Sequence, residues 1–120
     1  MNRYEKSLKN AKILIIGVSY KQDIDDYRES PALRVISILQ RYNANVEYYD
    51  PWVSEYIYMG EKYFSISEIN ESILRIYDMV MITAAHSNID YELVQKNAKV
   101  IFDTKNVMKY IKNRDNIEVL

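Results

Sequence analysis

The sequence contains no cysteine. Disulfides, thiolate nucleophiles and cysteine-ligated metal sites are therefore excluded, and the composition suits a reducing compartment. A strong charge imbalance is also missing, because 16 Lys and Arg residues stand against 17 Asp and Glu residues. Without an excess of positive charge, we expect neither nucleic acid nor an anionic membrane as a partner.

Long apolar runs are missing as well. No apolar stretch approaches the roughly 20 residues of a membrane-spanning helix, and residues 1–6 lack the apolar core of a secretion signal. These features predict a cytoplasmic protein. Only two glycines are present, so the chain has no Gly-x-Gly-x-x-Gly turn for a dinucleotide. A single histidine, His86, does not predict a metal site.

The 120 residues are enough for one domain that buries roughly two thirds of its unfolded surface. Residues 1–10 are polar and are predicted to form a tail or a connection. Residues 11–120 are predicted to form the single domain, since apolar segments alternate with polar ones from Ala11 onward.

Four apolar segments predict strands, at Lys12–Ile16, Asn45–Tyr49, Asp78–Thr83 and Lys99–Asp103, with a fifth expected at Ile117–Val119. The first is apolar from Ile13 to Ile16, as in a strand that is covered on both faces of a parallel sheet.

Helices are predicted between these strands. Ser30 is placed to cap a helix that begins at Pro31, and Asp90 is placed to cap a short helix from Tyr91. Ser65 to Glu68 has capping-box spacing and predicts a third helix, with Ile69, Ile73 and Ile76 on one face. The alternation predicts an α/β fold: a doubly wound, mainly parallel sheet in a Rossmann-like three-layer sandwich.

Ligands of such sheets bind beyond the carboxyl ends of the strands. Residues suited to a nucleotide follow four of the predicted strands: Tyr20 and Lys21, Asp50, Thr83 and His86, and Thr104, Lys105 and Asn106. Cations and a helix N-terminus suit a diphosphate, a carboxylate suits ribose hydroxyls, and aromatic rings suit a base. The loop between Gly17 and Pro31 carries far more charge than a plain connection needs.

The loop also carries a long, irregular signature. Gly17-x-x-Tyr20-Lys21-x-x-x-x-Asp26-x-Arg28-x-Ser30 is supported by Asp50-Pro51 and by Phe102-Asp103-Thr104. On these residues the chain resembles the C-terminal UDP-sugar-binding domain of the UDP-glucose/GDP-mannose dehydrogenase family. Asp26–Pro31 and Thr83–Ser87 are most similar to the bacterial branch acting on UDP-N-acetylglucosamine or UDP-N-acetylmannosamine.

This resemblance implies a parent enzyme that oxidises the C6 alcohol of a UDP-hexose or UDP-N-acetylhexosamine to the uronic acid, for surface polysaccharide, in two NAD-dependent steps. In the family, the NAD domain and a central region with the catalytic cysteine and lysine precede this domain, and homodimers form mainly through that central region. The present chain is therefore expected to bind UDP-sugar without catalysis and without a cofactor of its own.

The resemblance also implies roles for individual residues. Tyr20 and Lys21 match the pair that touches the UDP moiety, and Arg28 matches an arginine that reaches toward the cofactor. Asp25 and Asp26 are expected to organise this substrate-binding loop as hydrogen-bond acceptors rather than to act as an acid–base pair. An ion pair of Arg28 with either carboxylate is the structural alternative.

Two further positions are predicted to bind substrate. Lys105 stands where many relatives carry a UDP-contacting arginine, and lysine keeps the charge but loses the planar two-pronged donor. Asp50 occupies the acidic position that meets a ribose in dinucleotide folds, although Asp-Pro is also a good strand ending, and both interpretations stay open.

Other interpretations exist for the whole chain and for its aromatic residues. A free-standing nucleotide-sugar-binding or regulatory module without enzymatic activity is the alternative function. Trp52 and an aromatic cluster are expected either to pack against further domains or to cover the core; the cluster comprises Tyr56, Tyr58, Tyr63 and Phe64.

Overall fold

The computed structural model describes residues 10–19, 30–84, 86, 89–104 and 116–119. Five parallel strands form the main sheet in the order β2-β1-β5-β6-β7. Their bounds are Lys12–Ile16 (β1), Asn45–Tyr49 (β2), Met79–Ile82 (β5), Ile101–Asp103 (β6) and Ile117–Val119 (β7). All five predicted strands are confirmed, and three of them have the predicted bounds. This order is that of the flavodoxin-like doubly wound sheets.

Strand β1 lies at the centre of both cores. Ile13 and Ile15 belong to one apolar cluster, Leu14 and Ile16 belong to the other, and all four side chains are fully buried. Successive side chains of a strand point to opposite faces, so a continuous apolar run fills both cores at once. The prediction of a strand covered on both faces is therefore confirmed.

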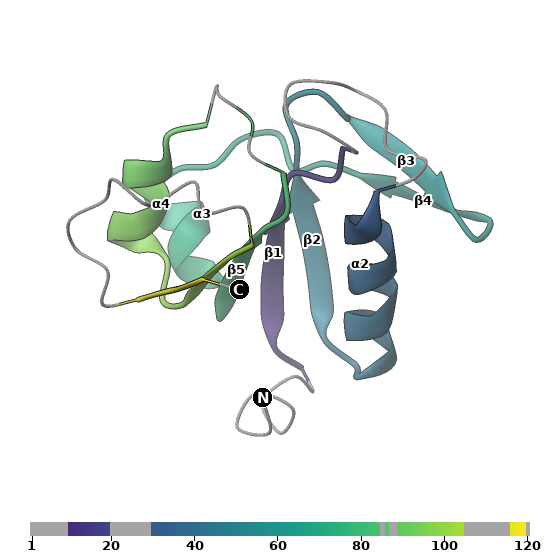
Figure 1. Cartoon of the computed structure of the whole chain (residues 1–120), viewed down its shortest axis with the longest axis horizontal. Helices are drawn as coiled ribbons and strands as arrows, with labels where there is room; N and C mark the ends of the chain where they lie inside the picture. The colour runs from purple at the N-terminus through teal and green to yellow at the C-terminus, as the bar shows by residue number, and fades with distance from the viewer. Residues whose placement is uncertain (1–9, 20–29, 85, 87–88, 105–115, 120) are drawn as a thin grey trace.

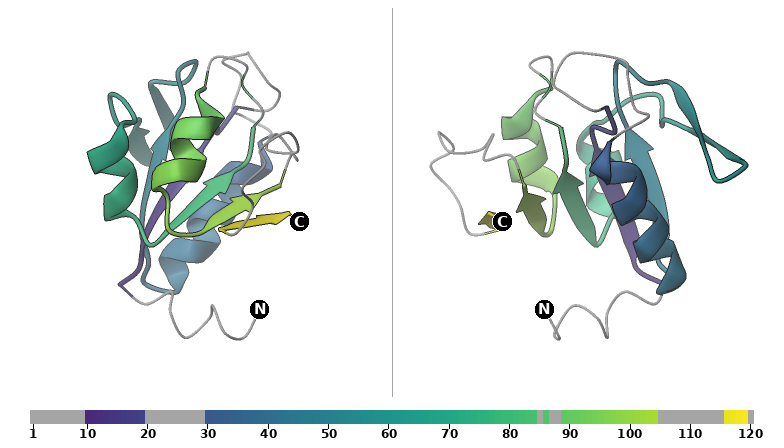
Figure 2. Two further views of the ribbon diagram at one scale, coloured as in Figure 1. Left: turned by 90° about the vertical axis from the view of Figure 1, so that its left-hand side faces the viewer. Right: turned by 45° about the vertical axis from the view of Figure 1, so that its right-hand side comes forward.

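Helices cover both faces of the sheet, as the three-layer prediction requires. Helix α2 (Pro31–Arg41) packs on one face, and α3 (Glu71–Ile76) and α4 (Tyr91–Asn97) lie together on the other (Figures 1 and 2). Helix α2 begins as predicted, because Pro31 takes the first helical position and the Ser30 hydroxyl accepts a hydrogen bond from the Ala32 amide at 3.2 Å.

An antiparallel hairpin, β3 (Glu55–Tyr58) and β4 (Glu61–Phe64), lies beside the α2 layer and was not predicted (Figure 1). Met59 and Gly60 at its turn both have positive φ, 51° and 83°, which matches the twist of a two-residue hairpin. The hairpin is held by aromatic packing: Tyr56 is buried, with its ring centroid 5.1 Å from that of Tyr48 and 5.0 Å from that of Tyr63.

The aromatic residues of this region divide into buried and exposed ones. Tyr56 covers the core, and Tyr58 and Tyr63 pack against it. Trp52 and Phe64 are 45% and 64% exposed.

The predicted capping box at Ser65 is wrong. Helix α3 begins only at Glu71, and its cap is Asn70, whose side chain accepts a hydrogen bond from the Ile73 amide at 2.9 Å. Ile66 is not helical: its amide donates to the Tyr48 carbonyl at 2.9 Å, beside the end of β2. Tertiary pairing with β2 therefore overrides the local capping signal.

The cap predicted for α4 is confirmed, since the Leu93 amide donates to the Asp90 carboxylate at 3.1 Å. Within the described ranges, no helix is long and apolar enough to cross a membrane.

Candidate functional site at the carboxyl edge of the sheet

The carboxyl ends of the parallel strands gather the predicted loops at one edge. Backbone hydrogen bonds continue past the strand ends, from Gly17 to Tyr49, from Thr83 to Ile16 and from Thr104 to Ile82, at 2.9, 2.9 and 3.2 Å. Strand β1 is the topological switch point, because the chain leaves it through α2 to β2 on one side and reaches β5 through α3 on the other. Doubly wound sheets bind ligands at this position.

Gly17 ends β1 at the switch point. Its φ is +88°, and a Cβ atom added there would lie 2.6 Å from the Cβ atom of Ala84 in the loop after β5. The Thr83 hydroxyl donates to the Gly17 carbonyl, which ties the same two loops together. The loops after β1 and β5 are thus in direct backbone contact at this edge.

Asp50 ends β2 and is buried, at 2% exposure. One carboxylate oxygen, Oδ2, accepts hydrogen bonds from the amides of Val18 and Ser19 at 2.8 and 3.2 Å. The other, Oδ1, accepts from the amides of Trp52 and Val53 at 2.7 and 3.2 Å. A single carboxylate therefore fixes the backbone of two loops.

His86 completes this cluster. The ring is fully buried, with Nε2 2.9 Å from Asp50 Oδ2 and 3.1 Å from Ser19 Oγ. A carboxylate oxygen only accepts hydrogen bonds, so Nε2 carries the proton that points at Asp50. A Ser-His-Asp triad needs serine and aspartate on different ring nitrogens, whereas here both lie at Nε2. The arrangement is therefore suited to holding loops and not to nucleophilic catalysis.

These contacts bear on the two interpretations of Asp50. A carboxylate has about four lone-pair sites, and four amides and an imidazole already surround this one. The geometry favours the role of organising the strand end, and a direct ribose contact would have to displace one of these partners.

The other predicted site residues lie outside the described residues: Tyr20, Lys21, Asp25, Asp26 and Arg28 in the loop after β1, and Lys105 after β6. Their substrate and cofactor roles stay predictions. The structure does fix where both segments start, since Ser19 and Thr104 lie at the same edge of the sheet.

Sequence reasoning missed the link between Asp50, Ser19 and His86. The three residues follow three different strands, and the signal that they share is a position beyond the carboxyl end of a strand. Among the described residues, no group of three His, Cys, Asp or Glu side chains could hold a metal ion.

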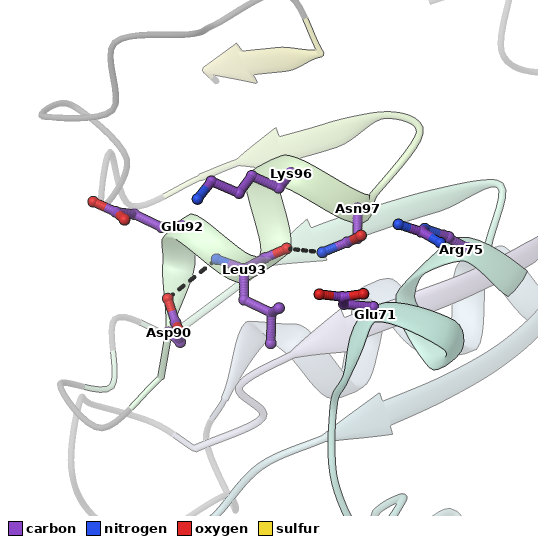
Figure 3. Close-up of a pocket in the computed structure, with 7 residues that line it drawn as sticks. All are labelled: Glu71, Arg75, Asp90, Glu92, Leu93, Lys96 and Asn97. Carbon is purple, nitrogen blue, oxygen red and sulfur yellow. Dashed lines mark hydrogen bonds between the residues drawn. The ribbon is translucent and has the colours of Figure 1, made fainter.

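A groove of about 340 Å³ lies elsewhere, between α3 and α4 (Figure 3). Among the described residues, its lining side chains come from these helices and the α4 cap: Glu71, Arg75, Asp90, Glu92, Leu93, Lys96 and Asn97. Asp50, the predicted site residue that the structure describes, is not among them. The groove is lined by both acidic and basic side chains and therefore does not favour an anionic ligand. Because doubly wound sheets bind ligands beyond the carboxyl ends of their strands, we place the candidate site at the strand ends.

The strand order, and the loops gathered at the carboxyl ends of the strands, define a doubly wound α/β domain of the kind that binds ligands at this edge of the sheet. Residues 14–110 match the UDP-binding domain of the UDP-glucose/GDP-mannose dehydrogenase family. The chain belongs to this family, and the resemblance inferred from the signature is confirmed.

Individual relatives agree with this assignment. The chain is 34% identical over 105 residues to the UDP-N-acetyl-D-mannosamine dehydrogenase of Methanocaldococcus jannaschii, covering 81% of this chain and 23% of that protein. It is 29% identical over 111 residues to the UDP-N-acetyl-D-glucosamine 6-dehydrogenase of Pseudomonas aeruginosa, covering 88% and 25%. The chain thus spans about a quarter of the length of the relatives that it matches.

Solved structures match over almost the whole chain. The UDP-N-acetyl-mannosamine dehydrogenase of S. aureus is 32% identical with a TM-score of 0.65, covering 99% of this chain and 27% of that one. The UDP-D-ManNAc dehydrogenase of Pyrococcus horikoshii is 25% identical with a TM-score of 0.71, covering 98% and 28%.

Proposed function

We propose that this chain binds the uridine diphosphate part of a nucleotide sugar on behalf of a UDP-sugar 6-dehydrogenase. The observation that carries the proposal is the match of residues 14–110 to a UDP-binding domain, over the segment that contains the switch point and the loops around it. In this proposal Tyr20 and Lys21 contact the UDP moiety, Asp25 and Asp26 organise their loop, and Lys105 adds a second cation.

The start of α2 supports an anionic ligand at this edge. The N-terminus of a helix carries a partial positive charge that favours anions. In α2 this charge acts without free amides at positions 31–33, since Pro31 has no N–H and the amides of Ala32 and Leu33 bond to Ser30. Helix α2 has 11 residues and no acidic side chain in its first turn, so nothing in that turn offsets this charge. A diphosphate placed between this helix and Lys21 would be stabilised from both sides.

For the parent enzyme, we propose oxidation of the C6 alcohol of a UDP-hexose or UDP-N-acetylhexosamine to the carboxylate. The named relatives act on UDP-N-acetylmannosamine and UDP-N-acetylglucosamine, which supports an N-acetylhexosamine. A homodimeric parent and a cytoplasmic location stay predictions.

NAD is the hydride acceptor in this proposal, and it would be bound mainly outside the present residues. The chain has only Gly17 and Gly60, so it cannot form a glycine-rich pyrophosphate turn. Its contribution toward the cofactor would be Arg28, reaching out of the domain. We therefore expect the chain alone to bind UDP and to lack dehydrogenase activity.

Calorimetric titration of the chain with UDP and with UDP-N-acetylglucosamine tests the proposal, with Lys21→Ala as the diagnostic variant. Lys62→Ala is the matched control, because it also removes one lysine charge, from an exposed position on the hairpin beside Glu55. We expect a loss of affinity of about tenfold for Lys21→Ala, as for one charged contact to phosphate, and little change for Lys62→Ala.

Similar affinity for the two ligands would indicate that recognition is of UDP and not of the sugar. Equal effects of the two lysine variants would contradict a specific phosphate contact at Lys21. No binding of UDP to the folded chain would contradict the proposed function of this domain on its own.

A further inference from the structure

We infer that His86 is a positioning residue for the nucleotide: through Asp50 it sets the backbone at Val18 and Ser19, from which the chain continues into Tyr20 and Lys21. This inference rests on the proposed function, because it assigns UDP binding to the loop that follows Ser19. It concerns a buried side chain that does not itself touch the ligand.

The first step of the argument is the convergence of three loops on one carboxylate. Asp50 belongs to the loop after β2, Val18 and Ser19 to the loop after β1, and His86 to the loop after β5. These loops flank the switch point. Their relative placement therefore depends on hydrogen bonds to Asp50 in addition to the strand ladder.

The second step is that His86 is itself held firmly. The Tyr91 hydroxyl, on the first residue of α4, donates to the His86 carbonyl at 2.8 Å. The ring Nε2 then reaches Asp50 Oδ2 and Ser19 Oγ at 2.9 and 3.1 Å. A continuous path of hydrogen bonds thus runs from α4 through His86 to the loop after β1.

The third step concerns which ring nitrogen matters. Oδ2 of Asp50, which accepts from Nε2, is also the oxygen that accepts from the amides of Val18 and Ser19. Without the Nε2 proton, this buried oxygen loses one of its three partners and can shift relative to the two amides. Displacement by a fraction of an ångström at Ser19 would be carried into the next residues along the chain, where a phosphate contact is sensitive to position.

Two amide substitutions separate this role from a general contribution to packing. In His86→Gln, the side-chain amide can place an N–H close to the position of Nε2, whereas in His86→Asn the amide reaches only the position of Nδ1. Tyr77→Phe is the control, because it also removes one hydrogen bond of a buried side chain, the bond from the Tyr77 hydroxyl to Glu47. Tyr77 lies just before β5 and therefore at the end of the sheet opposite the candidate site.

The experiment measures UDP affinity by calorimetry and thermal stability for the wild-type chain and the three variants. We expect His86→Asn to bind UDP about tenfold more weakly, because the displaced loop no longer places its phosphate contact accurately, and His86→Gln to stay within about threefold of wild type. Tyr77→Phe should lose stability without losing affinity. In ¹⁵N spectra of the wild-type chain, Nε2 of His86 should carry a proton.

The outcomes distinguish the two proposals. If the wild-type chain binds UDP and both His86 variants bind UDP as tightly as the wild type does, the positioning role is overturned while the proposed function stands. Equal weakening by Gln and Asn, or a proton on Nδ1 alone, would also overturn it, because then the Nε2 contact is not what matters. If the folded wild-type chain does not bind UDP, the proposed function fails and the positioning role fails with it.

Discussion

The contact between the loops after β1 and β5 can be tested by placing a methyl group into it. In Gly17→Ala, the new Cβ atom would lie 2.6 Å from the Cβ atom, 2.8 Å from the amide nitrogen and 3.0 Å from the Cα atom of Ala84. All three distances are shorter than van der Waals contact, and two of them involve backbone. The neighbouring loop would have to move, which typically costs about 1–3 kcal/mol.

The backbone conformation adds a second cost. Gly17 has φ = +88°, and the left-handed region costs a residue with a Cβ atom about 1–2 kcal/mol. Together the two effects predict a loss of about 2–5 kcal/mol, a large part of the 5–15 kcal/mol typical of a folded domain. For a domain of this size, about 4 °C per kcal/mol gives a fall in Tm of about 8–20 °C.

Gly60→Ala is a matched control, because Gly60 has φ = +83° but nothing within 4 Å of an added Cβ atom. It should lose only the backbone part, about 1–2 kcal/mol. Urea unfolding of both variants, and of Gly17→Ala combined with Ala84→Gly, separates the two effects. The combined variant should recover part of the difference, since the Cβ contact is removed and the backbone contacts remain. If Gly17→Ala lost no more than Gly60→Ala, the close approach of the two loops would be refuted.

Two further predictions concern stability. Ser30→Ala should lower the free energy of unfolding by about 1 kcal/mol, because it removes the acceptor that caps α2, and thermal unfolding without any fall in Tm would contradict the cap. Burial raises the pKa of Tyr48, Tyr56 and Tyr77, and the neighbouring Tyr56 and Glu47 act in the same direction on Tyr48 and Tyr77 respectively. Because the folded-state pKa values are raised, this stability is complete below about pH 10, the ordinary tyrosine pKa, and is lost as the pH rises above it. Urea unfolding between about pH 8 and 11 should show this decline, and Tyr77→Phe should make it shallower; a stability that does not change over this range would argue against the buried phenols.

Most of the sheet could be predicted because its signals are local. The apolar run from Ile13 to Ile16 is typical of a strand covered on both faces, and Ser30 followed by Pro31 is typical of a helix start. Such signals depend on a residue and its near neighbours in the chain, so they predict the same local structure whatever tertiary contacts form later.

The hairpin escaped prediction because its signals are not local. Its turn places Met59 at a positive φ. An Asn-Gly or Asp-Gly pair would have predicted such a turn, whereas methionine at this position does not. The hairpin is packed through Tyr56, whose ring is stacked on that of Tyr63 and tilted against that of Tyr48, and Tyr48 lies on another strand. A contact of that kind becomes visible only once the chain is folded.

Asp50 shows how an acid at this position can hold the fold together, whether or not it also meets the ligand. In dinucleotide-binding folds an acid at the end of the second strand faces the ligand and meets a ribose. Here the chain turns back directly after Asp50, so that the amides of Trp52 and Val53 bond to one carboxylate oxygen, and His86 reaches the other across the sheet edge.

This difference decides what a mutation at Asp50 can show. Removal of the carboxylate would release the loops after β1 and β2 together, so that weaker UDP binding would follow even if Asp50 never touches the ligand. A loss of affinity at Asp50 with a matching loss of stability therefore identifies an anchor of the site, whereas a loss at Lys21 with unchanged stability identifies a contact with the ligand. Only the two measurements together, on each variant, separate the residues that bind the nucleotide from those that hold the binding loop in place.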